Sequence, residues 1–242
     1  MSKLVNICGH SFLSTRLPTD QEALVVDLGA NNGDFSSEMI RRFRCRVEAA
    51  EPVPELYDRV RRMALPQLTI KNVAITGRSE ACMTLNLYNS RCASLLSPLS
   101  SADAGTAVTV TSKSLGDFLR TAFDCEPSRS IDLLKVDIEG AELEMFEAAE
   151  DRLLNRILQI SVEFHEFLFP ETRERIIEIK RRFTGLGFSV IDFSKVNTDV
   201  LFLNPALRLG VLELLFLHCE KYRLGAGRIL RRLRKTNVLV DH

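Results

Sequence analysis

Two hydrophobic periods alternate along most of the chain. Short runs in which nearly every position is apolar are typical of strands buried in a parallel sheet. Between them, apolar residues return every three or four positions, as on one face of a helix. The runs predict strands at Leu24–Leu28, Arg46–Ala50, Leu68–Ile75, Ile131–Val136 and Ile157–Phe164.

The helical stretches begin after Gly33, at Pro54, at Ser114, at Ala141 and at Glu171. Two later strands, Phe188–Phe193 and Val200–Leu203, are joined by a connection too short for a crossover, which predicts an antiparallel hairpin. This alternation predicts an α/β, Rossmann-like fold. We expect a seven-stranded, mostly parallel sheet with a C-terminal antiparallel hairpin and helices on both faces.

Residues 77–112 interrupt the alternation. They are rich in Ser, Thr, Ala and Gly, and we interpret them as a loop-rich insertion with a short hairpin formed by Met83–Leu87 and Ala107–Val110. A second change comes at Pro205. We therefore expect one catalytic domain over residues 1–204 and a basic, partly apolar, helical tail over residues 205–242.

Charge is spread unevenly although the formal net charge is zero. The tail holds eight Lys and Arg against three Asp and Glu, so the remaining chain is acidic and should not attract nucleic acid. The basic stretch 221–235 is expected to pack on the domain or on a homodimer partner. The alternative is contact with a membrane surface or a lipid-linked substrate.

Six cysteines are scattered without a C-x-x-C pair, which favours reduced thiols over disulfides or a zinc site. The first residues lack the apolar core of a signal peptide, and no apolar run is long enough to span a membrane. These features predict a cytoplasmic protein, and contact of the basic tail with a membrane would make it peripheral to that membrane.

The end of the first strand carries the strongest motif. Asp27 closes the apolar run, and Gly29, Ala30, Asn31 and Gly33 form a turn into the next helix. Such a turn opens a nucleotide pocket at the carboxyl end of a strand. The third glycine of a dinucleotide fingerprint is missing. An acid before a reduced glycine pattern favours a nucleoside with a cationic centre over a nicotinamide dinucleotide.

An acid ends the second strand as well. Glu51 lies at the position where doubly wound folds bind a ribose, because a carboxylate can accept hydrogen bonds from two hydroxyls. An exposed acid at a strand end is the plainer interpretation, but the nearby glycine turn favours ribose binding.

Acid and base side chains gather at the ends of the fourth and fifth strands. Asp137 should face the crevice, with Glu139 and Glu142 crowding the same turn, and Lys135 either pairs with an acid or snorkels. Glu163 and His165 are two residues apart and so share one strand face. His165 is the better general base by its intrinsic pKa, and Asp137 is the other candidate.

Three blocks, at residues 26–33, 134–142 and 162–165, occur in an order and spacing that resemble the FkbM family of S-adenosylmethionine-dependent methyltransferases. The pair Glu51-Pro52 and the residues Asn72 to Ala74 also fall where that family has similar residues. The resemblance covers roughly residues 20–204. It implies a class I methyltransferase fold and O-methylation of a hydroxyl, often on a sugar, a glycolipid or a secondary metabolite.

The resemblance also suggests roles for the motif residues. The glycine turn would lie under the methionine portion of S-adenosylmethionine, Asp27 would help to hold its ammonium group, and Asn72 and Ala74 would lie near adenine. Asp137, Glu163 and His165 would surround the methyl group and the acceptor hydroxyl. We expect no metal, although three acids would permit a divalent cation.

Two other functions stay open on the sequence alone. The chain could be a non-catalytic nucleoside-binding domain that docks partners through its tail, or a nicotinamide-dependent oxidoreductase. The crowded acid and base residues argue against the first, and the incomplete glycine fingerprint argues against the second.

Overall fold

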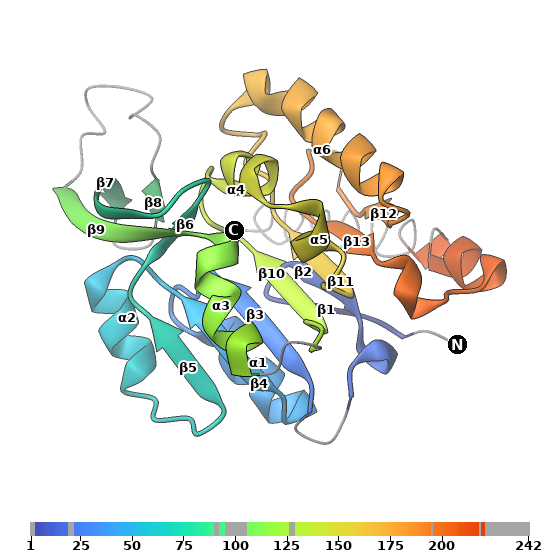
Figure 1. Cartoon of the computed structure of the whole chain (residues 1–242), viewed down its shortest axis with the longest axis horizontal. Helices are drawn as coiled ribbons and strands as arrows, with labels where there is room; N and C mark the ends of the chain where they lie inside the picture. Colours follow the sequence, from blue (N-terminus) through green and yellow to red (C-terminus); the bar gives the residue numbers. More distant parts are fainter. Residues whose placement is uncertain are drawn as a thin grey trace, which may run out of the picture.

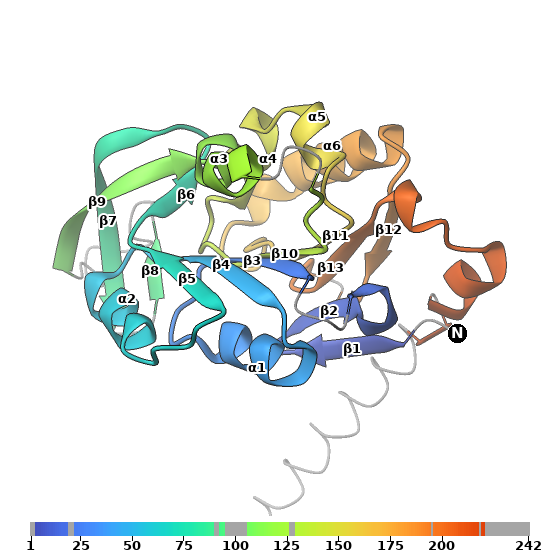
Figure 2. The same cartoon turned by 60° about the horizontal axis from the view of Figure 1, so that its bottom comes forward.

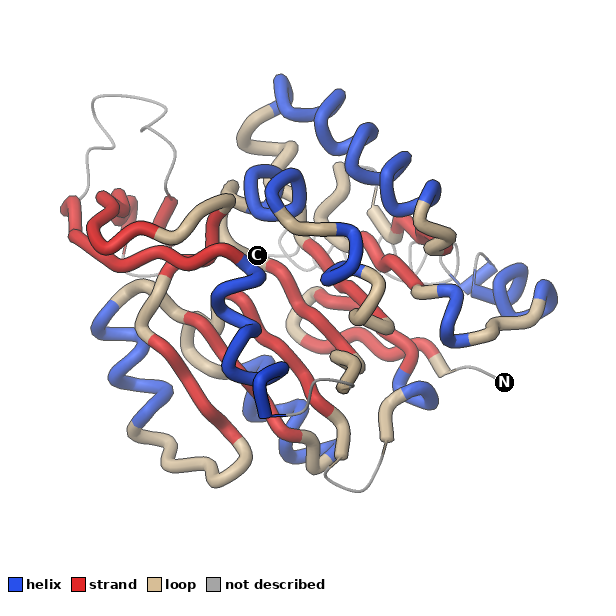
Figure 3. Tube along the Cα trace, in the orientation of Figure 1, coloured by secondary structure: helices blue, strands red, loops and turns tan. Residues whose placement is uncertain are grey.

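The computed structural model describes residues 3–18, 22–89, 92–94, 106–125, 129–194, 196–217 and 219–220. Its main body is a seven-stranded sheet (Figures 1 and 3) in the order β12-β13-β11-β10-β3-β4-β5. These strands are β3 (Leu24–Leu28), β4 (Arg46–Ala50), β5 (Leu68–Lys71), β10 (Leu133–Val136), β11 (Gln159–Val162), β12 (Ser189–Asp192) and β13 (Val200–Leu203).

Only β13 runs against its neighbours in this sheet, pairing antiparallel with both β11 and β12. The α/β fold, the seven strands and the C-terminal antiparallel hairpin predicted from the sequence are therefore confirmed. The order reverses between β3 and β10, which are the neighbours at the centre of the sheet. Ligands of open α/β sheets bind at such a switch point, outside the carboxyl ends of the strands.

Helices cover both faces of the sheet (Figure 2). They are α1 (Asp34–Phe43), α2 (Pro54–Arg61), α3 (Leu115–Cys125), α4 (Glu142–Ala148), α5 (Asp151–Leu154) and α6 (Arg173–Gly185). Alternate residues of the central strands enter two separate cores: Val26 packs with residues of α3, α4 and α6, and Val25 packs with residues of α1. This division follows from the period of two along each strand.

The predicted third strand, Leu68–Ile75, is wrong as a single element. The chain leaves the main sheet after β5, where the Val73 N–H donates to Lys71 O in a tight turn. Asn72 holds this turn, because its amide donates to the carbonyl oxygens of Glu51 and Pro52 at 2.8 and 2.9 Å. The next residues form β6 (Ala74–Thr76) in a different sheet.

That second sheet has four strands, in the order β6-β9-β7-β8. It comprises β6 with β7 (Glu80–Asn89), β8 (Cys92–Ser94) and β9 (Thr106–Ser114). The predicted hairpin exists, since β7 pairs antiparallel with β9 and places Met83 opposite Val110. Its strands are longer than expected, so much of the insertion is regular structure rather than loop.

An N-terminal hairpin was not predicted. β1 (Leu4–Ile7) and β2 (His10–Leu13) pair antiparallel and lie against β11 and β13 on the α1 face of the sheet (Figure 2). Buried Gln159 fastens β2 by accepting from the Leu13 N–H at 2.8 Å and donating to its carbonyl at 3.2 Å. Buried Asp199 likewise accepts from the Ser11 N–H and hydroxyl.

The C-terminal tail is described only in part. Residues 205–207 form a 3-10 helix and residues 211–217 are helical. Arg16 donates to both oxygens of Glu213 at 3.0 Å, and Leu217 is fully buried in the core, so this segment packs on the domain. The basic stretch 221–235 lies outside the described residues. Within the described ranges, we find no helix with the length and hydropathy of a membrane span.

Candidate active site

A cavity opens at the switch point, between the carboxyl ends of β3, β4 and β10 and the second sheet. Among the predicted site residues, Gly29, Asn31, Glu51, Ala74 and Asp137 line it. Its other walls are Ala50, Pro52, Val53, Leu56, Val73, Ile75, Leu85, Ile138 and Glu139. The main sheet thus supplies the polar edge of the cavity, while β6 and β7 supply an apolar wall.

Gly29 makes this arrangement possible. Its φ is +80°, and a Cβ there would lie 1.8 Å from the carbonyl oxygen of Asp137. No side chain fits in that space, so the β3 turn can approach the β10 end closely only with glycine at this position.

Glu51 is held by the turn that it faces. Its carboxylate accepts from the Asn31 N–H at 2.7 Å and from the Val53 N–H at 2.9 Å. Burial raises the pKa of this carboxyl to about 7, against the lowering effect of the two backbone hydrogen bonds. The carboxylate lies in the cavity wall, so it can accept hydroxyl hydrogens from a ribose through its remaining lone pairs.

The other four predicted cofactor residues, which are Asp27, Ala30, Gly33 and Asn72, do not line the cavity. Ala30 is buried in the α1-side core, and Gly33 has a φ of +81° at the start of α1. Asn72 holds the Glu51–Pro52 backbone, as described above. Asp27 is fully buried and accepts a hydrogen bond from the Ser36 hydroxyl at 2.6 Å, so its side chain lies beneath the turn.

The Lys135 ammonium lies between Asp27 and Asp137. It is 3.1 Å from Asp27 Oδ1 and 3.7 Å from Asp137 Oδ2, and it donates to Gly29 O at 2.6 Å. Burial disfavours the charge, but Asp27 and Asp137 outweigh burial and raise the pKa of Lys135. Of the two possibilities left open by the sequence, Lys135 pairs with acids and does not snorkel.

Asp137 lies close to three basic side chains, those of Lys135, His10 and His165. Burial opposes its ionisation, yet Lys135, His10 and His165 together hold the pKa of its carboxyl below the usual value. Its Oδ1 lies 3.8 Å from His165 Nε2. Asp137 is therefore an ionised carboxylate in the same wall as Gly29 and Glu51.

His165 lies between two carboxylates. Its Nδ1 is 2.9 Å from Oε1 of Glu142, which is buried, and its Nε2 is 3.3 Å from Glu139 Oε2. Burial lowers the pKa of the imidazole, but hydrogen bonds to Glu139 and Glu142 outweigh it and raise the pKa to about 11. This pKa favours the protonated imidazole at neutral pH, which does not suit the general-base role that the intrinsic pKa of His165 suggested.

Glu163 differs from its acidic neighbours. Of all its described surroundings, no side chain forms a hydrogen bond or ion pair with it, although it lies within 4.8 Å of ligand atoms of His10 and Asp137. Burial, followed by repulsion from Asp137, raises the pKa of its carboxyl to about 7. This carboxyl is the best proton acceptor of the cluster near neutral pH.

Sequence reasoning missed His10. This residue begins β2, is 1% exposed, and places its Nε2 3.7 Å from Asp137 Oδ2. Its ring packs edge-on against Phe35. Nothing in the local pattern indicates this, because His10 lies far from the motifs in the chain and reaches the site only through the packing of the hairpin.

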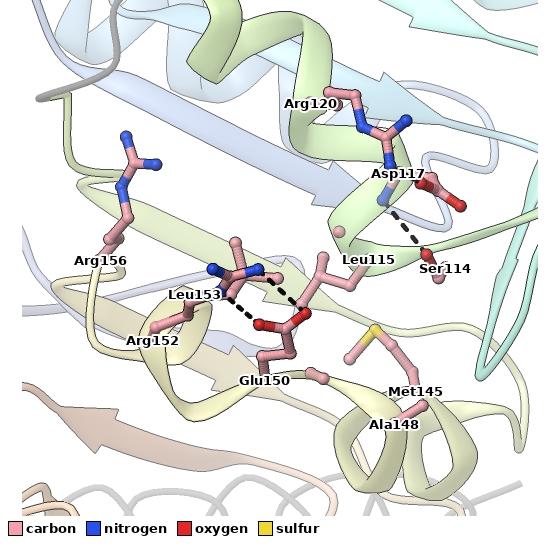
Figure 4. A pocket seen from close by; sticks show the side chains of 12 residues that line it. Ser114, Leu115, Asp117, Arg120, Met145, Ala148, Glu150, Arg152, Leu153 and Arg156 are labelled. Carbon is pink, nitrogen blue, oxygen red and sulfur yellow. Dashed lines mark hydrogen bonds and ion pairs between the residues drawn. The ribbon is translucent and has the colours of Figure 1, made fainter.

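A separate groove lies between α3, α4 and α5 (Figure 4). Two of its three arginines pair with acids, Arg152 with Glu150 and Arg120 with Asp117, and the third, Arg156, donates to the carbonyl oxygen of Arg129. None of the predicted catalytic residues lines this groove.

Known proteins resemble this chain in sequence and structure. Residues 27–190 match the Methyltransferase FkbM domain. Methyltransferase sdnD of Sordaria araneosa is 32% identical over 186 residues, covering 65% of this chain and 71% of that protein.

Two solved structures are similar at low identity. Human Methyltransferase-like protein 13 in complex with SAH has a TM-score of 0.45 at 11% identity, covering 86% of this chain and 82% of that chain. Aeropyrum pernix fibrillarin with bound S-adenosyl-L-methionine has a TM-score of 0.39 at 11% identity, covering 77% and 67%.

The family match spans the glycine turn, Glu51 and the β10 end, which line the cavity, and also the β11 end, which carries Glu163 and His165. Members of this family use S-adenosylmethionine as methyl donor. The chain belongs to the FkbM family of S-adenosylmethionine-dependent methyltransferases.

Proposed function

We propose that this methyltransferase acts on a hydroxyl oxygen of a small molecule, such as a sugar, a glycolipid headgroup or a secondary metabolite. The observation that supports this most is the position of Asp137. It lines the cavity together with Gly29 and Glu51, and it lies beside Glu163 and His165. Glu163 and His165 do not line the cavity themselves, but both lie next to Asp137, which does, so a proton acceptor would be close to a cofactor bound there.

The cofactor would lie across the β3 turn. Glu51 would accept the ribose hydroxyls, Gly29 and Asn31 would lie under the methionine portion, and Ala74 on β6 would contact the adenine. Asp27 would act through Lys135 and Ser36 by keeping the turn in place. The sulfonium would then face the ionised Asp137, which stabilises positive charge there.

Transfer is an in-line displacement. The acceptor oxygen forms a bond to the methyl carbon as the carbon–sulfur bond breaks, and the bonding electrons leave with neutral S-adenosylhomocysteine. The hydroxyl proton passes to Glu163, whose carboxylate has no other described partner. A positioned base of this kind contributes about 10²–10⁴-fold to rate.

The acceptor side is partly apolar. Phe167 and Leu168 follow β11 and are 49% and 37% exposed, and the Phe167 ring lies 5.6 Å from the His165 ring. An aromatic ring beside charged groups suits an acceptor with both an apolar face and hydroxyls, such as a sugar ring. A free amine would meet His165 as a like charge.

The test is a methyl-transfer assay with labelled S-adenosylmethionine against glycosides, polyols and aromatic alcohols, each paired with its amine analogue. Glu163→Gln should lower kcat about 10²–10⁴-fold and leave cofactor affinity unchanged. Glu178→Gln, an exposed site on α6, is the matched control and should match the parent chain.

Selective transfer to the amine analogues would refute hydroxyl specificity. Cofactor binding without methyl transfer to any of the acceptors would instead support a non-catalytic nucleoside-binding role.

A further inference from the structure

We propose that Asp137, Glu139 and His165 form a binding site for one divalent cation of the first transition series, open toward the cofactor cavity. The proposal rests on the proposed function, because the cation would hold the acceptor's hydroxyl, or a neighbouring pair of hydroxyls, beside the methyl group.

Three ligand atoms converge around one point. His165 Nε2 lies 3.3 Å from Glu139 Oε2 and 3.8 Å from Asp137 Oδ1, and one ligand atom from each residue lies within 4.8 Å of the others. Ligands at about 2.0–2.2 Å from a shared ion are separated by about 3–3.5 Å, so small side-chain rotations complete the site. Asp137 and Glu139 also line the cavity, which leaves the remaining coordination positions facing a bound acceptor.

The imidazole is oriented as a ligand. Metal-binding histidines commonly donate their other ring N–H to a carboxylate, which fixes the ring and leaves the second nitrogen for the metal. Glu142 Oε1 is 2.9 Å from His165 Nδ1, and Glu142 is in turn fixed by the N–H groups of Ile138 and Gly140. This directs Nε2 toward Asp137 and Glu139, where a bound ion would replace the proton that this nitrogen shares with Glu139.

An independent observation comes from the N-terminal hairpin. His10 is 1% exposed, and its Nε2 has no hydrogen-bond partner within the described part of the chain. It points at the cluster and lies 3.7 Å from Asp137 Oδ2. A carboxylate bound to a metal through Oδ1 presents Oδ2 to donors, and His10 is poised to be such a donor.

A second set of possible ligands also contains Asp137. His10, Asp137 and Glu163 have ligand atoms within 4.8 Å of one another. The Lys135 ammonium decides between the sets, because it lies 3.7 Å from Oδ2, on the side that faces His10. Like charges at such distances repel strongly in a buried site, so a cation is favoured on the Oδ1 side with Glu139 and His165.

The ligand set indicates the class of ion. One imidazole nitrogen with two carboxylates suits Mn²⁺, Fe²⁺, Co²⁺ or Zn²⁺ better than Ca²⁺, which takes oxygen ligands alone. As a Lewis acid, the ion would make the bound hydroxyl more acidic and ease transfer of its proton to Glu163. Glu163 is not a ligand in this arrangement.

The experiment uses the whole chain stripped with EDTA. Mn²⁺ binding is followed by the loss of its free EPR signal, and Co²⁺ binding by its visible absorption, which reports a nitrogen ligand. We expect one ion per chain. His165→Ala and Glu139→Gln should weaken Mn²⁺ at least tenfold, and Glu142→Gln about 10–100-fold.

Glu163→Gln is the discriminating variant. It should bind Mn²⁺ within about threefold of the parent affinity, whereas the alternative ligand set requires it to lose the ion. Circular dichroism verifies that each variant is folded, and Glu178→Gln is the surface control.

Absence of Mn²⁺ and Co²⁺ binding at millimolar concentrations, or loss of binding in Glu163→Gln but not in His165→Ala, would overturn the cation site. S-adenosylmethionine affinity is measured separately on the stripped chain. Methyl transfer that persists in EDTA, with no ion bound, would refute the cation and leave the proposed function intact. If the chain binds the ion but transfers methyl groups to no hydroxyl, the cation site stands and the proposed function is refuted.

Discussion

At the scale of single residues, Glu51 belongs both to the fold and to the proposed ribose site. Its two backbone hydrogen bonds tie the β3 turn to the β4 end, and burial raises its pKa to about 7. Between about pH 4.5 and 7, Glu51 in the folded chain therefore keeps a proton that it has already released in the unfolded chain. The stability that this group contributes falls as the pH rises through that window.

If Glu51 binds the ribose as proposed, the same group makes cofactor binding depend on pH. Ribose hydroxyls donate to the ionised carboxylate, so below pH 7 binding must first remove a proton. We predict that the Kd for S-adenosylmethionine rises by up to about tenfold per pH unit below 7 and levels off above it. Calorimetry from pH 5.5 to 7.5 measures this. Glu51→Gln removes the titration, so parallel pH profiles for the variant and the parent would refute the assignment.

The pKa of His165 depends on its neighbours more than on the imidazole itself. Its usual pKa near neutrality indicated a base, but Glu139 and Glu142 flank its two nitrogens and raise its pKa, which favours the protonated imidazole at neutral pH. Glu163, a weak base by its ordinary pKa, is the better proton acceptor here because burial and Asp137 raise its pKa.

At the scale of elements, the β1–β2 hairpin brings His10 to the β10 end and is fastened by the buried Gln159. Replacement of Gln159 with Leu keeps the size but leaves the Leu13 N–H and C=O without partners. We predict a loss of about 2–4 kcal/mol in the free energy of unfolding.

Urea denaturation measures this loss. Gln67→Leu, at a half-buried position without a side-chain hydrogen bond among the described residues, is the matched control and should change stability by less than about 0.5 kcal/mol. Equal effects of the two substitutions would show that Gln159 does not fasten the hairpin.

At the scale of the whole molecule, the cofactor cavity joins three strands of the main sheet to the second sheet. A ligand that bridges these parts binds only the folded chain. At 100 times its Kd it adds about 2.7 kcal/mol of stability. For a chain of this length we predict a rise in Tm of about 5–10 °C with S-adenosylmethionine or S-adenosylhomocysteine.

Differential scanning fluorimetry is the measurement, with NAD⁺ and adenosine at the same concentration as controls. A larger shift with NAD⁺ would contradict the cofactor assignment. Little or no shift with either sulfur nucleoside would place their binding outside this cavity.

The sequence by itself determined the α/β class, the mostly parallel main sheet with its C-terminal antiparallel hairpin, and the residues at the carboxyl ends of its strands. Buried parallel strands need continuous apolar runs, and the turns that follow them need glycine and acids at set distances, as at Gly29 and Glu51. These are local requirements, so local patterns reveal them. The single strand expected over Leu68–Ile75 failed because Asn72 bonds to the distant Glu51–Pro52 backbone, which no local period records.

Only the tertiary structure decided which side chains share the site and in which charge state. His10 lies beside Asp137 although more than a hundred residues separate them in the chain, and Lys135 forms an ion pair with Asp27 beneath the turn. The pKa of each group depends on burial and on its neighbours in space. The identities of the acids and bases were therefore readable in the sequence, whereas their roles depend on distances that folding alone creates.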